Sequence, residues 1–158
     1  KGRPVAGAVY APAISQLWIG GREAYRMTVA AGASLETARD RQPIKTRMTP
    51  DAGWIVVASR SHPDKTTGDF IDALPVGERI SAGSSLKFCL VAEGRADVYP
   101  RFGPTMEWDV AAGHAIILAA GGTVVDGEGR PFRYGKEKFK SGPFIALGQE
   151  RLVERLFS

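Results

Sequence analysis

The chain has 158 residues, of which 44% are hydrophobic and 24% are charged, and its formal net charge is +4. This composition is typical of one globular domain with a hydrophobic core, and it excludes a disordered or collagen-like chain. The longest apolar run, 115–120, is too short to span a membrane, and the chain opens with no apolar leader. We therefore expect a cytoplasmic protein without stable membrane insertion, and leave open a peripheral association with the inner membrane.

The cysteine count and the charge pattern exclude further classes. The single cysteine, Cys89, excludes an internal disulfide and a cysteine-based zinc site. A loose cluster of basic residues lies near the end of the chain: Arg130, Arg133, Lys136, Lys138 and Lys140. No aromatic stacking motif accompanies it, which favours a solvated face over a nucleic-acid patch. We expect no nucleic-acid partner, and the net charge equally suits a small anionic substrate.

The first 50 residues predict an antiparallel meander. Strands are expected at 5–10, 16–19 and 23–29, with Gly20 and Gly21 forming the turn between the last two. The polar stretch 33–49 contains Pro43 and is predicted to be a loop with an edge strand. The chain begins in a turn and lacks an initiator Met, so we expect it to be a fragment.

From residue 53 strands and helices alternate. Strands are predicted at 53–60, 77–83, 96–102, 122–132 and 143–148, and helices at 63–74, 84–94, 109–120 and 149–157. The alternation predicts an α/β fold, layered, with a mixed sheet flanked by helices. The helix at 109–120 has His114 as its only polar side chain after Asp109, so it should be buried on most faces.

Polar residues gather where a sheet of this kind binds ligands, beyond the carboxyl ends of strands and at the amino ends of the following helices. Three stretches fit this description: 59–62 (SRSH), 82–87 (AGSSLK) and 99–109 (YPRFGPTMEWD).

Each stretch has a functional and a structural interpretation. Lys87 in a first helical turn opposes the helix dipole, which points to an anion beside Ser84 and Ser85, although a serine cap with Lys87 in solvent is slightly favoured by spacing alone. His62 before Pro63 is more often a loop hydrogen-bonder than a ligand. Arg101 could grip a phosphate, but a loop arginine is more often a surface residue.

Asp109 opens an otherwise apolar segment and admits two interpretations. As an N-cap it would accept a backbone N–H, which is worth about 1 kcal/mol and requires no function. As a metal ligand it would offer a carboxylate from a rigid helix end. From the residues alone, the cap is favoured.

Three longer stretches carry a resemblance to a known family: ASRSH at 58–62, GSSLKFCLVAEG at 83–94 and YPRFGPTMEWDVAAGHA at 99–115. They resemble the CysQ-type 3'(2'),5'-bisphosphate nucleotidases of the lithium-sensitive inositol monophosphatase superfamily. The Trp-Asp-x-Ala-Ala-Gly element is specific to that superfamily, and GSSLKFCLVAEG to the CysQ branch. The implied fold is the carboxyl-terminal part of the inositol monophosphatase-like sugar phosphatase fold.

The resemblance implies a phosphatase that converts adenosine 3',5'-bisphosphate to AMP and phosphate in sulfate assimilation, with two or more Mg²⁺ ions per site. By the family pattern Asp109 is a catalytic residue and metal ligand. Arg101 is a candidate for gripping a phosphate, and the residues that match positions lining the nucleotide are Ser61, His62, Gly83, Ser84 and Lys87. A nucleotide bisphosphate is therefore the expected small-molecule partner.

The sequence also departs from the family pattern. The family's other metal carboxylates, a Glu and an Asp-Pro-x-Asp-Gly-Thr motif, are expected upstream of residue 1, and no such motif occurs here. We therefore expect the carboxyl-terminal half of the enzyme, inactive alone, in which 1–50 completes a truncated amino-terminal domain and 51–158 forms an α/β domain. An inositol-phosphate phosphatase and a non-catalytic nucleotide-binding or dimer-forming fragment are the alternatives, and a homodimer is left open.

Overall fold

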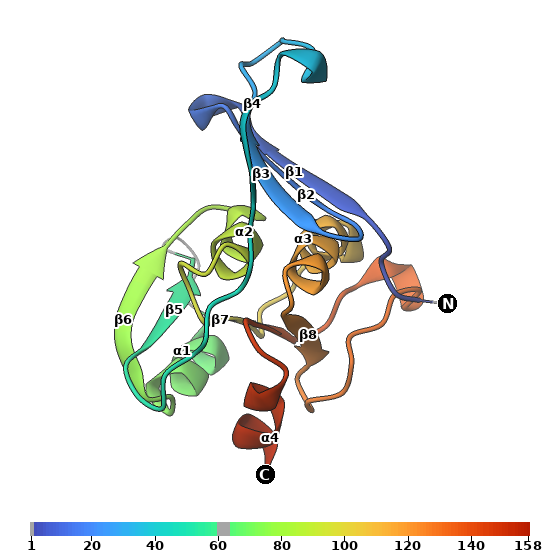
Figure 1. Cartoon of the computed structure of the whole chain (residues 1–158). Helices are drawn as coiled ribbons and strands as arrows, with labels where there is room; N and C mark the ends of the chain where they lie inside the picture. Colours follow the sequence, from blue (N-terminus) through green and yellow to red (C-terminus); the bar gives the residue numbers. More distant parts are fainter. Residues whose placement is uncertain (1, 60–63) are drawn as a thin grey trace.

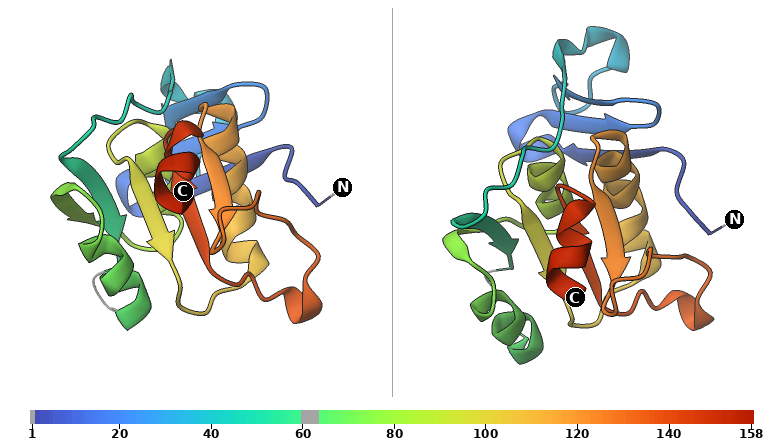
Figure 2. Two further views of the ribbon diagram at one scale, coloured as in Figure 1. Left: turned by 90° about the horizontal axis from the view of Figure 1, so that it is seen from below. Right: turned by 60° about the horizontal axis from the view of Figure 1, so that its bottom comes forward.

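The computed structural model describes residues 2–59 and 64–158, which form alternating layers of sheet and helix (Figure 1). A four-stranded sheet forms one outer layer, and helices α2 (Leu86–Ala92) and α3 (Glu107–Ala119) lie between it and a five-stranded sheet. Helices α1 (Lys65–Asp72) and α4 (Arg151–Phe157) cover the far face of the second sheet, as Figure 2 shows for α4. The predicted α/β class is confirmed.

The first sheet is an antiparallel meander in the order β1-β2-β3-β4. Its strands are β1 (Gly7–Ala11), β2 (Gln16–Gly20), β3 (Ala24–Thr28) and β4 (Arg39–Pro43), joined in part through short 3₁₀ turns at Pro12–Ile14 and Leu35–Thr37. The register pairs Val9 with Trp18 and Trp18 with Arg26. The three predicted strands are confirmed, and so is the edge strand within 33–49.

The second sheet is mixed, in the order β6-β5-β7-β9-β8. Its strands are β5 (Trp54–Ala58), β6 (Val76–Ser81), β7 (Val98–Arg101), β8 (Thr123–Asp126) and β9 (Phe144–Leu147). Strand β5 pairs in parallel with β6 and β7, whereas β9 runs antiparallel to β7 and β8. The carboxyl ends of β5, β6 and β7 therefore lie at one edge of the sheet.

Two predicted boundaries are wrong. The strand expected at 122–132 ends at Asp126, because the Asp126 carboxylate accepts the backbone N–H groups of Glu128 and Arg130 and turns the chain. A 3₁₀ turn at Glu137–Phe139 follows that was not expected. Helix α3 begins at Glu107, two residues before Asp109. No helix in residues 2–59 and 64–158 is long and apolar enough to cross a membrane.

Helix α3 packs on its neighbours at distances that only glycine allows. A Cβ atom at Gly20 would lie 2.5 Å from the Cα of Ile116, and one at Gly7 would lie 2.5 Å from the carbonyl oxygen of Ala112. On the other side of the helix, a Cβ atom at Gly113 would lie 2.4 Å from Cγ of Phe88 in α2. Gly113 is the glycine of the Trp-Asp-x-Ala-Ala-Gly element, so this part of the motif has a packing role.

The substitution Gly113→Ala tests this packing. Phe88 is 2% exposed, and its ring lies 5.0 Å from that of Tyr99 and 5.4 Å from that of Phe144, so it has no room to withdraw. We expect Gly113→Ala to lower the free energy of unfolding by about 1–3 kcal/mol in urea titrations. Gly21→Ala is the control, because nothing lies within 4 Å of a Cβ atom there. Equal effects of the two substitutions would contradict the packing role.

Candidate active site

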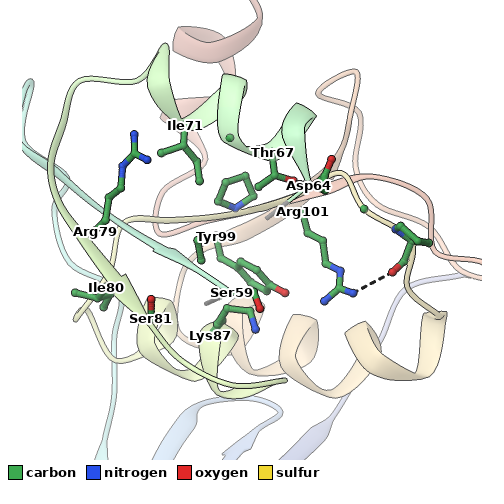
Figure 3. A pocket seen from close by; sticks show the side chains of 15 residues that line it. Ser59, Asp64, Thr67, Ile71, Arg79, Ile80, Ser81, Lys87, Tyr99 and Arg101 are labelled. Atoms are coloured by element: carbon green, nitrogen blue, oxygen red, sulfur yellow. Dashed lines mark hydrogen bonds between the residues drawn. The ribbon is translucent and has the colours of Figure 1, made fainter. Parts of the chain in front are cut away.

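A cavity of about 560 Å³ opens at the edge of the second sheet where β5, β6 and β7 end (Figure 3). Helix α1 forms one wall, and Arg79, Ile80 and Ser81 of β6 form another. The remaining lining comes from the end of β5, from Lys87 in α2 and from the segment 99–104. Ligand sites of α/β proteins occur at this kind of sheet edge.

Lys87 is a buried cation in the cavity wall. Its side chain is 2% exposed, and Nζ donates hydrogen bonds to the carbonyl oxygens of Ala82 (3.3 Å) and Ser84 (3.0 Å). The same atom lies 5.0 Å from the centre of the Tyr99 ring. Burial, and secondarily the positive charge of Arg101, lower the pKa of Lys87 to about 8. The alternative in which Lys87 points into solvent is therefore wrong.

Arg101 ends β7 and lines the same cavity. Its Nη2 donates a hydrogen bond to the carbonyl oxygen of Pro104 at 2.9 Å, which ties the guanidinium to the loop that leads to α3 (Figure 3). Tyr99 lies between Arg101 and Lys87 in the lining, and burial raises the pKa of its hydroxyl. Lys87, Arg101 and a neutral phenol thus face one cavity, an arrangement suited to an anionic ligand.

Asp109 is exposed and lies in the first turn of α3, not at its N-cap as expected from the sequence. Its Oδ2 accepts a hydrogen bond from the hydroxyl of Thr105 (2.9 Å) and one from the backbone N–H of the N-cap residue, Met106 (3.2 Å). The carboxylate therefore caps the helix from its third position, as the acidic residue of a capping box does. Its other oxygen, Oδ1, accepts no hydrogen bond from the residues described.

The predicted site residues other than Asp109, which does not line the cavity, divide into three groups. Lys87 and Arg101 line the cavity, and Ser84 holds Lys87 through its carbonyl oxygen. Gly83 contributes its carbonyl oxygen to Leu86 N–H at 3.2 Å and does not line the cavity. Ser61 and His62 lie outside the described residues, so their predicted roles stay predictions.

Several lining residues were not predicted from the sequence. Asp64, Thr67, Gly68 and Ile71 come from α1, and Arg79 from β6. Asp64 is the N-cap of α1 and accepts the backbone N–H of Thr66 at 3.1 Å. An acidic residue after Pro63 is a recognisable helix start, so the sequence could have placed α1 at the site edge.

Two carboxylates of the described residues lie in this region. Both oxygens of Asp64 accept hydrogen bonds from the first turn of α1, so Asp109, with one oxygen unused by the described residues, is the better candidate for a metal ion. No group of three or more His, Cys, Asp or Glu side chains in residues 2–59 and 64–158 could hold a metal. A Mg²⁺ ion takes oxygen ligands, is often held by only one or two carboxylates, and keeps waters or substrate oxygens in its other positions. Asp109, with a free oxygen at the positive end of a helix, fits one position of such a site and no more.

Comparison with known proteins gives consistent results. The model of the inositol monophosphatase family matches residues 1–156. A 3'(2'),5'-bisphosphate nucleotidase CysQ of Salmonella typhimurium is 41% identical over 135 residues, which cover 85% of this chain and 50% of that protein. A 3'(2'),5'-bisphosphate nucleotidase 1 of Dictyostelium discoideum is 30% identical over 168 residues, covering 96% of this chain and 51% of the relative.

The solved structures agree with the sequence comparison. The crystal structure of CysQ from Bacteroides thetaiotaomicron superimposes with a TM-score of 0.81 at 41% identity, over 95% of this chain and 59% of that one. An inositol monophosphatase from Zymomonas mobilis gives 0.75 at 23% identity, over 99% of this chain and 57% of that one, and shows the shared fold alone. The resemblance drawn from the sequence is confirmed. The chain spans about half the length of the curated relatives it matches.

The substitution Lys87→Met tests whether the lysine is buried. Because the pKa of Lys87 falls from 10.5 to about 8 on folding, the unfolded chain binds more protons than the folded chain between these values. Stability should therefore rise with pH, by roughly 2 kcal/mol between pH 7 and 9.5 for this one group. We expect urea titrations of Lys87→Met to lack this increment, and Lys65→Met, at an exposed lysine, to retain it. The same pH dependence in all three proteins would show that Lys87 is solvated.

Proposed function

Because the chain belongs to the inositol monophosphatase family, we propose that it supplies the nucleotide-binding part, and one metal-binding carboxylate, of a magnesium-dependent 3'(2'),5'-bisphosphate nucleotidase. In this reaction a water oxygen bonds to the phosphorus of the 3'-phosphate of adenosine 3',5'-bisphosphate while the bond to O3' breaks, giving AMP and phosphate. The observation that carries the proposal is the buried Lys87, which faces the same cavity as Arg101.

The two cations have donors left for phosphate oxygens. Lys87 Nζ carries three N–H groups and uses two of them on the carbonyl oxygens of Ala82 and Ser84. Among the described residues, Arg101 uses one N–H on Pro104, and its other N–H groups have no acceptor there. An anion bound between them would offset the cost of burying the lysine charge, which gives the cavity a preference for phosphate over neutral ligands.

The rest of the cavity favours a nucleotide over an inositol phosphate. Ala58, Ile71, Ile80 and Pro100 contribute apolar surface to the lining. An aromatic base can bury its faces against such surface, whereas the hydroxyl groups of inositol would lose hydrogen bonds to water there. The nucleotidase relatives at 41% identity support the same choice.

We assign Asp109 as one ligand of magnesium, consistent with its place in the first turn of α3 and with its Oδ1, which accepts no hydrogen bond from the residues described. Bound magnesium would activate a water and neutralise charge on the phosphoryl group. The chain's own contribution is to fix the carboxylate: Thr105 and Met106 N–H hold Oδ2, which leaves Oδ1 pointing in one direction. We propose that the other ligands come from the part of the relatives' length that this chain does not span.

A second candidate function, nucleotide binding, is favoured by the lack of a three-residue metal cluster among the described residues. In that case the chain binds the nucleotide without hydrolysing it. Several points stay predictions. They are the division into parts at residue 50, the contacts of Ser61 and His62, a homodimer, a role in sulfate assimilation, and a cytoplasmic location with or without peripheral membrane association.

The test compares phosphate release by the chain alone with release by the chain joined to the amino-terminal half of the Salmonella typhimurium relative. With adenosine 3',5'-bisphosphate and Mg²⁺ we expect little or no release by the chain alone and magnesium-dependent release by the joined protein. In the joined protein, Asp109→Asn should lower the rate of phosphate release at least about a hundredfold, because it removes a metal-binding charge.

Two controls decide between the candidates. Asp69 is exposed and lies away from the cavity lining, so Asp69→Asn should leave the rate of phosphate release unchanged. Myo-inositol 1-phosphate should be a poorer substrate than the bisphosphate. Tight binding of the bisphosphate with no turnover by the joined protein would favour the non-catalytic candidate, and faster turnover of the inositol phosphate would contradict the proposed substrate.

A further inference from the structure

Helix α1 faces Lys87 across the cavity, as the positions of Thr67 and Ile71 in Figure 3 show, and Gly68 lies inside this helix. The backbone N–H of Gly68 donates a hydrogen bond to the carbonyl oxygen of Asp64 at 3.0 Å, as is usual in a helix. Glycine destabilises a helix interior relative to alanine. Unlike Gly20 and Gly113, Gly68 has nothing within 4 Å of where its Cβ atom would lie. Packing among the described residues therefore gives no reason for glycine here.

The space that the absent side chain leaves belongs to the cavity. Gly68 lines the cavity together with Thr67 and Ile71 of the same helix. Ile80 and Arg79 of β6 line it as well, and the Arg79 guanidinium is paired with Asp72 of α1. Two further cationic groups, Lys87 and Arg101, come from other elements of the wall (Figure 3). The lining thus has the apolar side chain of Ile71 and an ion-paired arginine near the carboxyl end of α1, and two further positive charges in other parts of the wall.

Helix α1 is tied to its neighbours at both ends, and these contacts oppose a shift of the helix away from a larger residue at 68. At its amino end, the hydroxyl of Thr67 accepts the backbone N–H of Phe102 at 2.9 Å. The Phe70 and Phe102 rings lie 5.2 Å apart, which adds an apolar contact to this tie. At its carboxyl end, Asp72 forms an ion pair with Arg79 of β6. A side chain added at Gly68 would therefore extend into the cavity.

We infer that Gly68 sets which phosphate esters the cavity accepts, because its missing side chain leaves the space that the purine base occupies between α1 and β6. The phosphates then extend toward Lys87 and Arg101. This inference rests on the proposed function and adds to it the position that distinguishes a nucleotide from a phosphate ester without a base.

The experiment titrates the chain with adenosine 3',5'-bisphosphate and with ribose 5-phosphate, which lacks the base, by isothermal calorimetry. We expect Gly68→Leu to weaken binding of the bisphosphate by at least about tenfold, because the added side chain and the base would compete for one space. Binding of ribose 5-phosphate should change by less than about twofold. Thr66→Leu is the matched control, because Thr66 is exposed on the same helix and does not line the cavity. It should leave both affinities as in the wild type.

Gly68→Ala provides a check that does not depend on how well the leucine variant folds. It should raise the melting temperature, since alanine favours the helix, and still weaken bisphosphate binding by about threefold. A raised melting temperature with unchanged affinity would overturn the inference. So would equal binding of the bisphosphate by Gly68→Leu and the wild type, or an equal loss for both ligands. If the wild-type chain binds no bisphosphate, the proposed function fails, and the inference fails with it.

Discussion

The close approach of helix α3 to its neighbours is the constraint on which the rest of this structure depends. Backbone contact at Gly7 and Gly20 holds the first sheet against α3, and Gly113 lets the Phe88 ring of α2 lie against the helix backbone. The two helices therefore form one rigid layer between the sheets. Because Lys87 lies in the first turn of α2 and Asp109 in the first turn of α3, this packing also fixes how the cation and the carboxylate are placed. A hydrogen bond of 3.4 Å from the Ser85 hydroxyl to the carbonyl oxygen of Asp109 joins the two helix starts.

Aromatic and ionic contacts connect this layer to the cavity. The Phe88 ring meets the Tyr99 ring edge to face, and the centre of the Tyr99 ring lies 5.0 Å from Lys87 Nζ in the cavity wall. Directly before β7, the fully buried Asp97 accepts two hydrogen bonds from Arg47 (2.8 and 2.6 Å) and one from Ile55 N–H (2.7 Å). These bonds fix the segment between the two sheets. The result is a rigid frame around a lysine whose burial costs stability, a combination typical of functional sites.

The order and type of most elements could be predicted from the sequence, because apolar periodicity and turn residues agree with the final packing. The burial of Lys87 could not. The sequence pattern of 84–94 indicates one buried face with Leu86, Cys89, Leu90 and Glu93, but α2 lies between two sheets and is buried on nearly all sides. A helix that packs against a sheet on both sides has no polar face, so its sequence pattern does not reveal which polar side chains are buried.

Other differences arise from side-chain chemistry that periodicity does not record. The Asp126 carboxylate ends β8 by binding two backbone N–H groups, and Asp109 caps α3 from inside its first turn. Lys138 and Phe139 both adopt left-handed backbone angles, with φ of 53° and 54°, which residues of these types rarely do. The part of α1 in the cavity wall was missed because Thr67, Gly68 and Ile71 are not residue types that mark a ligand site in a sequence.

The central claim is that this sheet edge binds a nucleotide through the buried lysine. A crystal structure of the chain with adenosine 3',5'-bisphosphate tests it most directly. We predict a phosphate oxygen within hydrogen-bonding distance of Lys87 Nζ, about 3 Å away, with the base between α1 and β6. Nucleotide bound elsewhere on the chain, with Lys87 still bonded only to the carbonyl oxygens of Ala82 and Ser84, would contradict the account.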